Sequence, residues 1–345
     1  MRDPDDILII RPSALGDVCR SVPVLSSLKR RYPRAGIDWL VQDAFAPAIR
    51  HHPDLRRAIP FPRDKMARDL LRGKPGSLVS FVRTLRRPRY GLVVDAQGLF
   101  RSGFFSFVTG APIRVGDRSA RESGWIFSTR SVRTDPRTHT VDRMLEIAKA
   151  AGARPEPDLR LHTGSGQRGE AERLLSASLG RHARQGPIVL APTARWAAKR
   201  WPAERFLELA RHLLASTPHP IVVVGGPGER TQCAPLLRLC RSEARAADLV
   251  GKTGVGGLLG VIERARLVVA NDSAALHMAV GLERGIVGLF GPTDVARVGP
   301  YGRAGDVLQH PDPDRMDHKL DQNAVVMRQI SVREVIDACH RRLGA

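Results

Sequence analysis

LVVANDSAALHMAVGLERGIVGLFGPTD, residues 267–294, is the stretch from which the fold is best predicted. Its first apolar run, 267–270, predicts a buried strand of a parallel sheet, and the polar residues after it open a helix. A second buried run, 286–290, ends in another polar turn, Gly291–Asp294. Because open α/β sheets bind ligands at the carboxyl ends of their strands, two such turns in succession predict a binding edge.

The first turn holds three candidate binding residues. Ser273 is predicted to be the N-cap of the helix, which leaves backbone N–H groups free for an anion such as phosphate. Asp272 is a fixed acceptor suited to sugar hydroxyls, and His277 lies one helical turn beyond Ser273. A structural interpretation stays open for each: every such turn needs a cap, and a histidine next to Met278 is often a core residue.

Length and composition indicate a two-domain α/β protein. The chain has 345 residues, 42% of them hydrophobic, which is enough for two buried cores. No apolar run is long enough to cross a bilayer and the start lacks a signal-peptide core, so we expect the protein to stay in the cytosol. The four cysteines lack metal-ligand spacing and are expected to be reduced, mostly buried thiols.

The formal net charge is +20, a large surplus of positive charge. Nucleic acid, an acidic membrane surface, or phosphorylated and carboxylated substrates would each suit such a surplus. A GC-rich base composition that favours arginine would also produce it without any partner. The three Tyr and ten Phe are not interleaved with basic residues, which disfavours a nucleic-acid reader.

The chain begins with a strand at 6–10, a turn at Arg11–Asp17 and a helix. This unit lacks GxGxxG, so a dinucleotide fingerprint is absent. Asp17 sits near the helix N-terminus, where a carboxylate is stabilised in its ionised form. From this segment alone it is equally a candidate general base and a helix-capping residue.

The rest of the chain alternates strand and helix, which predicts two doubly wound parallel sheets. The basic stretch 56–89 is expected to be a mobile loop followed by a helix, and the segment 154–169 an interdomain linker with a short strand. The expected domains are 1–165 and 166–325, and a C-terminal helix in 326–345 is expected to pack back on the first. Further strands are expected at 37–41, 91–94, 113–115, 188–191, 221–224 and 249–250.

Two loops of the second half add candidate ligand contacts. The loop before Pro202 presents Thr193, Arg195 and Lys199, whose cations could neutralise a diphosphate. Its tryptophans, in the structural interpretation, only bury apolar area. After the strand at 221–224, glycines permit close backbone approach, and Glu229 could accept from a ribose or base.

Taken together, seven short motifs in order resemble the bacterial lipopolysaccharide heptosyltransferases, glycosyltransferase family 9, which have the GT-B fold. The match covers nearly the whole chain, and the SARE segment is most similar to the heptosyltransferase I branch. The motifs are Ser13–Asp17, Asp95–Arg101, Ser119–Glu122, His139–Arg143, Lys199–Pro202, Asp272–His277 and Gly291–Asp294.

The resemblance implies two Rossmann-like domains that face each other across a cleft, an acceptor domain and a nucleotide-sugar domain. It implies an inverting, metal-independent transfer, without a cofactor, of L-glycero-D-manno-heptose from ADP-heptose to the Kdo of a lipid A-linked acceptor. Asp17 would be the general base and Lys199, with the Ser273 helix N-terminus, would stabilise the leaving ADP. The basic surface also suggests loose attachment to the anionic inner leaflet of the inner membrane.

The candidate site residues, from the loops and from the resemblance together, fall into two sets. One position departs from the family, because Ala274 stands where the family usually has Gly, and its methyl group would crowd a backbone that approaches the diphosphate. The donor set is Thr193, Arg195, Glu229, Asp272, Ser273, Ala274, His277 and Thr293, and the acceptor set is Ser13, Gly16, Arg57, Arg63, Arg101, Arg121 and Arg143.

Other functions remain open at this point. A transferase of the same family could use a different acceptor or nucleotide sugar. A GT-B-like nucleotide-sugar 2-epimerase would share the two-domain architecture and the phosphate-binding turn. A non-catalytic protein that binds nucleic acid through its basic surface is the third class, and its binding should collapse at moderate salt.

Overall fold

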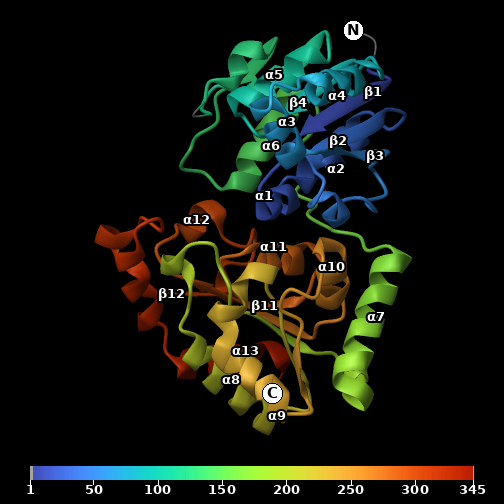
Figure 1. The fold of residues 1–345 in the computed structure, drawn as a ribbon. Helices are drawn as coiled ribbons and strands as arrows, with labels where there is room; N and C mark the ends of the chain where they lie inside the picture. The colour runs from blue at the N-terminus through green and yellow to red at the C-terminus, as the bar shows by residue number, and fades with distance from the viewer. Residues whose placement is uncertain (1–2, 121, 345) are drawn as a thin grey trace. The chain divides into compact units, whose positions relative to one another are not determined.

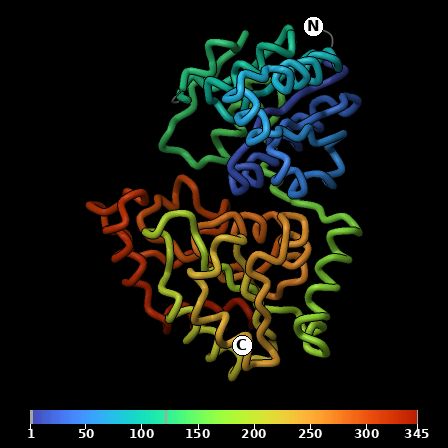
Figure 2. Tube along the Cα trace, viewed as in Figure 1, coloured from blue at the N-terminus to red at the C-terminus, as the bar shows by residue number. Residues whose placement is uncertain are grey.

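The computed structural model describes residues 3–120 and 122–344 and consists of two compact units, Met1–His162 and Thr163–Ala345 (Figure 1). The boundary lies three residues before the expected one. Figure 2 allows the chain to be followed through the first unit, from blue to green, and then through the second, from green to red. Each unit is a parallel sheet with helices on both faces, as the alternating pattern predicts.

The sheet of the first unit has six parallel strands in the order β3-β2-β1-β4-β5-β6. Its centre is the expected strand β1, whose apolar run is fully buried because helices cover both faces of the sheet. The strands β3 and β6 were not expected. The strands are β1 (Asp6–Ile10), β2 (Gly36–Gln42), β3 (Arg57–Phe61), β4 (Leu92–Asp95), β5 (Ile113–Asp117) and β6 (Arg130–Val132).

Three helices of this unit share one apolar cluster on one face of the sheet. Met66, Phe81 and Phe105 project from α3, α4 and α5 onto strand residues such as Leu8 and Val93. The expected mobile loop in 56–89 is therefore wrong: the segment forms β3, α3 and α4. The helices are α1 (Leu15–Arg20), α2 (Val22–Arg31), α3 (Arg63–Leu71), α4 (Gly76–Arg86), α5 (Phe100–Val108) and α6 (Thr140–Ala150), with short 3-10 turns η1 (Ala46–Ala48) and η2 (Gly124–Phe127).

The second sheet also has six parallel strands, in the order β12-β11-β10-β7-β8-β9. In the pair β10 and β11, Asn271 is in register with Leu289, so both polar turns of residues 267–294 leave the sheet at the same edge, as expected. The strands are β7 (Ile188–Ala191), β8 (Ile221–Val223), β9 (Ala246–Asp248), β10 (Leu267–Asn271), β11 (Gly285–Phe290) and β12 (Val307–Gln309).

The C-terminal helix α13 belongs to the second unit. Its residues Val335 and Cys339 are fully buried in the cluster that α8 and α9 form with the sheet, so the expected packing on the first domain is wrong. The α-helices are α7 (Ser165–Leu179), α8 (Ala203–Ser216), α9 (Ala234–Ser242), α10 (Val255–Glu263), α11 (Ala274–Gly281), α12 (Val295–Val298) and α13 (Val332–Leu343). The 3-10 turns are η3 (Gly180–Gln185), η4 (Ala197–Lys199), η5 (Pro227–Cys233), η6 (Ala304–Asp306), η7 (Pro313–Arg315) and η8 (Asp321–Gln329).

Three other expectations can be compared with the structure. Residues 151–164 contain no strand, so the linker is irregular throughout its length. Cys19, Cys233 and Cys339 are buried and Cys240 is half-buried, and all four are free thiols, as expected. Within residues 3–120 and 122–344, no helix has the length and apolar character that a membrane crossing needs.

Candidate active site

The predicted binding edge of the second sheet contains an ion pair between Lys199 and Asp272. Lys199 ends the 3-10 turn η4 and Asp272 follows β10, and the distance from Lys199 Nζ to Asp272 Oδ2 is 2.6 Å. Their side chains are only 15% and 10% exposed. Because both were predicted independently as donor-site residues, the structure brings together a cation and a carboxylate that sequence separates by more than seventy positions.

Asn271 fixes the geometry of this pair. It is completely buried at the end of β10 and donates from Nδ2 to the carbonyl of Pro192 at 2.7 Å, while its Oδ1 accepts from Trp201 N at 3.2 Å. The Trp201 indole in turn donates to the carbonyl of Ile330 at 2.9 Å. These bonds tie the loop that carries Lys199 to the strand that carries Asp272, so the ion pair is held by buried hydrogen bonds on both sides.

Two hydroxyl groups at the same edge, those of Ser273 and Thr293, are buried and have no hydrogen-bond partner among the described residues. Ser273 is the N-cap residue of α11, as predicted, but its side chain makes no capping hydrogen bond. Thr293 follows β11, where Gln309 Nε2 donates to its carbonyl at 2.8 Å. Unsatisfied buried hydroxyls beside a helix N-terminus are suited to receive an anionic ligand.

Close packing also explains one glycine of the second turn. A Cβ atom on Gly291 would lie 2.7 Å from the Met327 sulfur and 2.9 Å from the Ala198 carbonyl oxygen. The turns η4 and η8 therefore pack on each other and against the end of β11. His318, in the segment before η8, has its pKa lowered by burial and by the positive charge of Lys199, which favours a neutral imidazole beside the ion pair.

The other predicted donor residues have different surroundings. Thr193 is buried after β7, whereas Arg195 is exposed and stacks over the Trp196 ring at 5.2 Å. Glu229 accepts from the backbone N–H of Gly226 at 2.7 Å and so caps its own turn. His277 is buried at 6% exposure in α11, and Ala274 is half-buried as the first residue of that helix.

In the first unit, Asp17 lies between two arginines. The distance from Arg20 to Asp17 Oδ1 is 2.5 Å and from Arg11 to Asp17 Oδ2 is 3.4 Å. Burial alone would raise the pKa of Asp17, but the charges of Arg11 and Arg20 lower it to about 2. The carboxylate also accepts from the backbone N–H of Ala14 at 3.4 Å, so it helps to cap the helix. The ionised side chain is 28% exposed.

A second carboxylate of this edge, Asp95 at the end of β4, is almost fully buried. It accepts hydrogen bonds from the backbone N–H groups of Gln97 and Gly98 and from the Ser102 hydroxyl at 2.9 Å. Burial raises its pKa to about 6. Through these hydrogen bonds Asp95 organises the loop after β4, and the Gln97 side chain of that loop accepts from Ser13 N at 3.2 Å.

Several predicted acceptor residues lie at this edge. Ser13, Arg63 and Arg101 line one small pocket, together with Gln97 and Phe105. Gly16 is in the first turn of α1, directly before Asp17. The structure therefore brings Ser13, Arg63 and Arg101 together.

Other predicted acceptor residues are not brought to that pocket. Arg57 starts β3 and pairs with the buried carboxylate of Asp38 at 2.9 Å, at the amino ends of the strands, so it is on the opposite edge. Arg143 pairs with Asp117 at 3.0 Å at the end of β5, where its charge is already neutralised. Arg121 lies outside the described residues.

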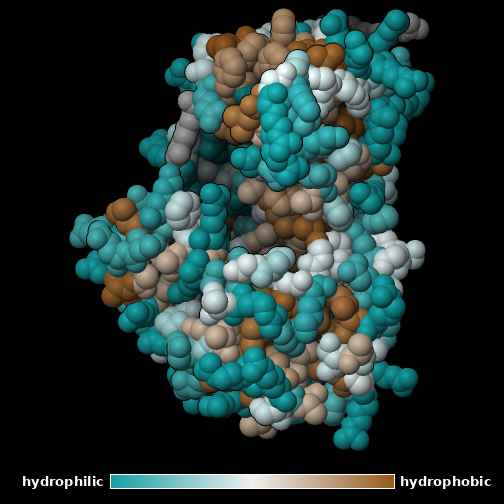
Figure 3. Space-filling view, in the orientation of Figure 1, coloured by the Kyte–Doolittle hydropathy of each residue, from teal (hydrophilic) through white to brown (hydrophobic). Residues whose placement is uncertain are grey.

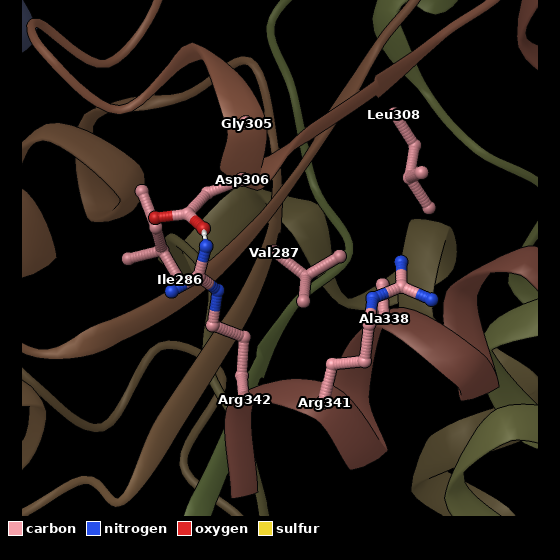
Figure 4. Close-up of a pocket in the computed structure, with 8 residues that line it drawn as sticks. All are labelled: Ile286, Val287, Gly305, Asp306, Leu308, Ala338, Arg341 and Arg342. Carbon is pink, nitrogen blue, oxygen red and sulfur yellow. Dashed lines mark ion pairs between the residues drawn. The ribbon is translucent and has the colours of Figure 1, made fainter.

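The second unit has a further pocket at the amino ends of β11 and β12, away from the predicted binding edge (Figure 4). Asp306, 6% exposed, forms an ion pair with Arg342 in this pocket, and Arg303 also pairs with Asp306 at 2.5 Å. The apolar side chains of Ile286 and Leu308 line the same space. Two arginines thus neutralise the buried carboxylate, which gives this cluster a structural role.

Sequence reasoning missed the groups that support the predicted residues. Arg11 directly follows β1 and Arg20 lies three positions after Asp17, a spacing that could have indicated the ion pair. Arg200, which donates from Nε to the Ala194 carbonyl at 2.8 Å, gave no signal beyond its position next to Lys199. Within residues 3–120 and 122–344, no group of three His, Cys, Asp or Glu side chains is arranged to hold a metal ion.

Two parallel six-stranded sheets with polar turns at their carboxyl edges place the protein in the class of two-sheet α/β proteins with the GT-B fold. The chain belongs to glycosyltransferase family 9, the heptosyltransferases, because the model of that family matches residues 78–323. Lipopolysaccharide heptosyltransferase 1 of Pseudomonas aeruginosa is 30% identical over 303 residues, 86% of this chain and 82% of that one. Lipopolysaccharide heptosyltransferase 2 of Salmonella typhimurium is 27% identical over 88% of this chain and 87% of that one.

Solved structures agree on the fold. The E. coli ADP-heptose lipopolysaccharide heptosyltransferase II superimposes with a TM-score of 0.79, at 23% identity, over 98% of both chains. The E. coli heptosyltransferase WaaC with ADP-2-deoxy-2-fluoro heptose gives 0.76, at 23% identity, over 97% of this chain and 99% of that one. The expected GT-B architecture of two Rossmann-like sheets is therefore confirmed.

Proposed function

We propose that this protein transfers L-glycero-D-manno-heptose from ADP-heptose to the Kdo of a lipid A-linked acceptor in lipopolysaccharide core biosynthesis, with inversion at the anomeric carbon. Relatives of both types, named lipopolysaccharide heptosyltransferase 1 and 2, support the substrate class. A solved neighbour that holds an ADP-heptose analogue supports the donor. The observation that carries the proposal is the Lys199–Asp272 pair next to the N-terminus of α11.

The donor half of the reaction needs stabilisation of ADP as it leaves. Lys199 supplies a positive charge for the diphosphate, and the N-terminus of α11 adds the positive end of the helix dipole. Asp272 holds the ammonium group in place, and its carboxylate is proposed to accept from sugar hydroxyls of the donor. The unsatisfied hydroxyls of Ser273 and Thr293 are proposed to donate to diphosphate oxygens.

The acceptor half needs a base for the attacking sugar hydroxyl. Asp17 is ionised throughout the neutral range, but a carboxylate with a pKa of about 2 is a weak base. A Kdo carboxylate bound beside Arg11 and Arg20 would compete for the same guanidinium groups and raise the pKa of Asp17. In this proposal the acceptor itself activates the base, and Ser13, Arg63 and Arg101 bind other acceptor groups.

The first test is the reaction itself. Purified protein is incubated with ADP-heptose and a Kdo-containing acceptor, and ADP release is compared with the mass of the glycosylated product. The proposal expects both in equal amounts. A parallel incubation without acceptor checks for epimerised nucleotide sugar, which is the signature of the epimerase alternative. Product from other nucleotide sugars or acceptors, and none from ADP-heptose and Kdo, would contradict the substrate assignment.

The second test separates the donor hydroxyls from folding. Ser273→Ala and Thr293→Val remove buried hydroxyls that have no partner in the described residues, so the free energy of unfolding should change little. If the hydroxyls bind the diphosphate, each change should weaken ADP binding by about three- to tenfold, which corresponds to the net free energy of one hydrogen bond. Isothermal titration with ADP and thermal unfolding measure the two effects. Unaltered ADP affinity in both variants would remove them from the site.

A further inference from the structure

Exposed large apolar side chains are concentrated on one part of the first unit. Among the described residues, six of the eight lie within residues 70–126. They belong to successive elements, α3, α4, α5 and η2. The six are Leu70 (46% exposed), Leu71 (88%), Val79 (44%), Phe100 (52%), Phe107 (53%) and Ile126 (53%).

These elements present one continuous surface. The inner sides of α3, α4 and α5 meet in a single cluster through Met66, Phe81 and Phe105, and α4 packs between the other two helices. The turn η2 packs on α5, and the Phe127 ring lies 5.8 Å from that of Phe107. Because the inner sides share one core, the outer sides adjoin, and we call this outer surface the α3–α5 face. Figure 3 shows brown hydrophobic residues among teal ones on the visible surface of the first unit.

The same face is strongly basic. Residues 63–89 contain nine Lys and Arg and two Asp, a net charge of +7. Within the described part of the chain, the ion pairs of this unit use other arginines, such as Arg56 and Arg143, and none uses a base from 63–89. The exposed turn Arg72-Gly73-Lys74 lies directly beside Leu71, the most exposed of the apolar residues.

We propose that the α3–α5 face docks on a lipid bilayer with anionic headgroups, with Leu71 and its apolar neighbours inserted at the acyl boundary and the bases at the phosphates. The positive charge of the face is complementary to anionic headgroups. Stable attachment to a membrane surface needs both apolar insertion and a polybasic patch, and the α3–α5 face has both.

This inference deepens the proposed function, because a lipid-linked acceptor is presented at a bilayer surface. Ser13, Arg63 and Arg101, the proposed acceptor contacts, come from elements of the same unit, and Arg63 and Arg101 are in the first turns of α3 and α5. An enzyme attached through the α3–α5 face would meet its acceptor by diffusion in two dimensions.

Vesicle flotation tests the proposal with the full chain and no acceptor. We expect binding to vesicles of phosphatidylcholine mixed with phosphatidylglycerol and little binding to phosphatidylcholine alone. Arg72→Glu with Lys74→Glu should reduce the partition coefficient at least 25-fold, since each lost cation is worth about fivefold at an anionic surface. Leu71→Ser should reduce it several-fold through lost apolar insertion.

Matched controls come from the second unit. Arg181→Glu with Arg184→Glu changes the net charge equally, and Leu320→Ser removes a leucine of 47% exposure, so neither should alter vesicle binding. Thermal unfolding checks that every variant folds, and turnover on a delipidated, water-soluble acceptor should stay normal in the α3–α5 variants. That last assay keeps membrane docking separate from transferase activity.

Three results would overturn the docking proposal. Equal loss in the control and α3–α5 variants would mean that net charge alone attracts the protein. Binding only to vesicles that contain the acceptor glycolipid would assign the attachment to the acceptor site. No binding to anionic vesicles, with normal turnover on the soluble acceptor, would reject the docking surface and leave the proposed function intact.

Discussion

Replacement of Lys199 by methionine gives the sharpest test of the donor site. Methionine keeps most of the length of the side chain and removes the ammonium group that lies 2.6 Å from Asp272 Oδ2. With side chains only 15% and 10% exposed, the pair is weakly screened by solvent, so the lost charge-assisted hydrogen bond should cost about 1.5–3 kcal/mol of unfolding free energy.

The effect of this replacement on the turnover rate should be larger than its effect on stability. If Lys199 neutralises the departing diphosphate, Lys199→Met should lower turnover by about 10²–10³, the cost of removing one preorganised group that stabilises developing charge. ADP binding should weaken at least tenfold, because ADP carries the same diphosphate. Steady-state kinetics with ADP-heptose and isothermal titration with ADP measure these quantities.

A double variant separates structure from chemistry. Lys199→Met with Asp272→Asn removes both charges and should recover most of the lost stability, while turnover stays low. Arg333→Met is the matched control, because its pair with Asp337 is 81% and 42% exposed and should be worth less than about 1 kcal/mol. Unchanged ADP affinity in Lys199→Met would refute the reasoning and reduce the lysine to a structural partner of Asp272.

Two further variants, Asp17→Asn and Asn271→Ala, test the proposed base and the residue that holds the Lys199 loop. Asp17→Asn should lower turnover at least about a hundredfold with ADP affinity retained, which kinetics and titration check together. Because Arg11 and Arg20 hold the pKa of Asp17 at about 2, its stabilising contribution is present above the unfolded pKa of about 3.9 and is lost as pH falls toward 2. Acid unfolding of wild type and Asp17→Asn should therefore converge below that range and differ by about 2 kcal/mol at neutral pH; parallel curves would contradict this. Asn271→Ala should cost about 2–4 kcal/mol in chemical denaturation by leaving two buried backbone groups unpaired, and an effect below 1 kcal/mol would show that other groups hold the loop.

The sequence by itself determined the periodicity of the fold. Continuous apolar runs such as 7–10 and 267–270 can be buried only when helices cover both sheet faces, so a doubly wound parallel sheet followed from them directly. The polar turns after those runs indicated the ligand-binding edge, since parallel strands carry their carboxyl ends to one side. Asp17, Lys199 and Asp272 were predicted from this logic and from motifs that resemble those of the family.

What only the tertiary structure decided depends on contacts between distant segments. The many Lys and Arg residues of the 56–89 segment predicted a mobile loop followed by a helix. The segment is instead ordered from its start, because Met66, Phe81 and Leu85 pack into a core shared with other strands. Arg57 was predicted to be a cation available to the acceptor, but the register of β2 and β3 places it beside Asp38. Charge pairing and burial depend on which residues are neighbours in space. They cannot be predicted from local sequence, because the register of the strands determines those neighbours.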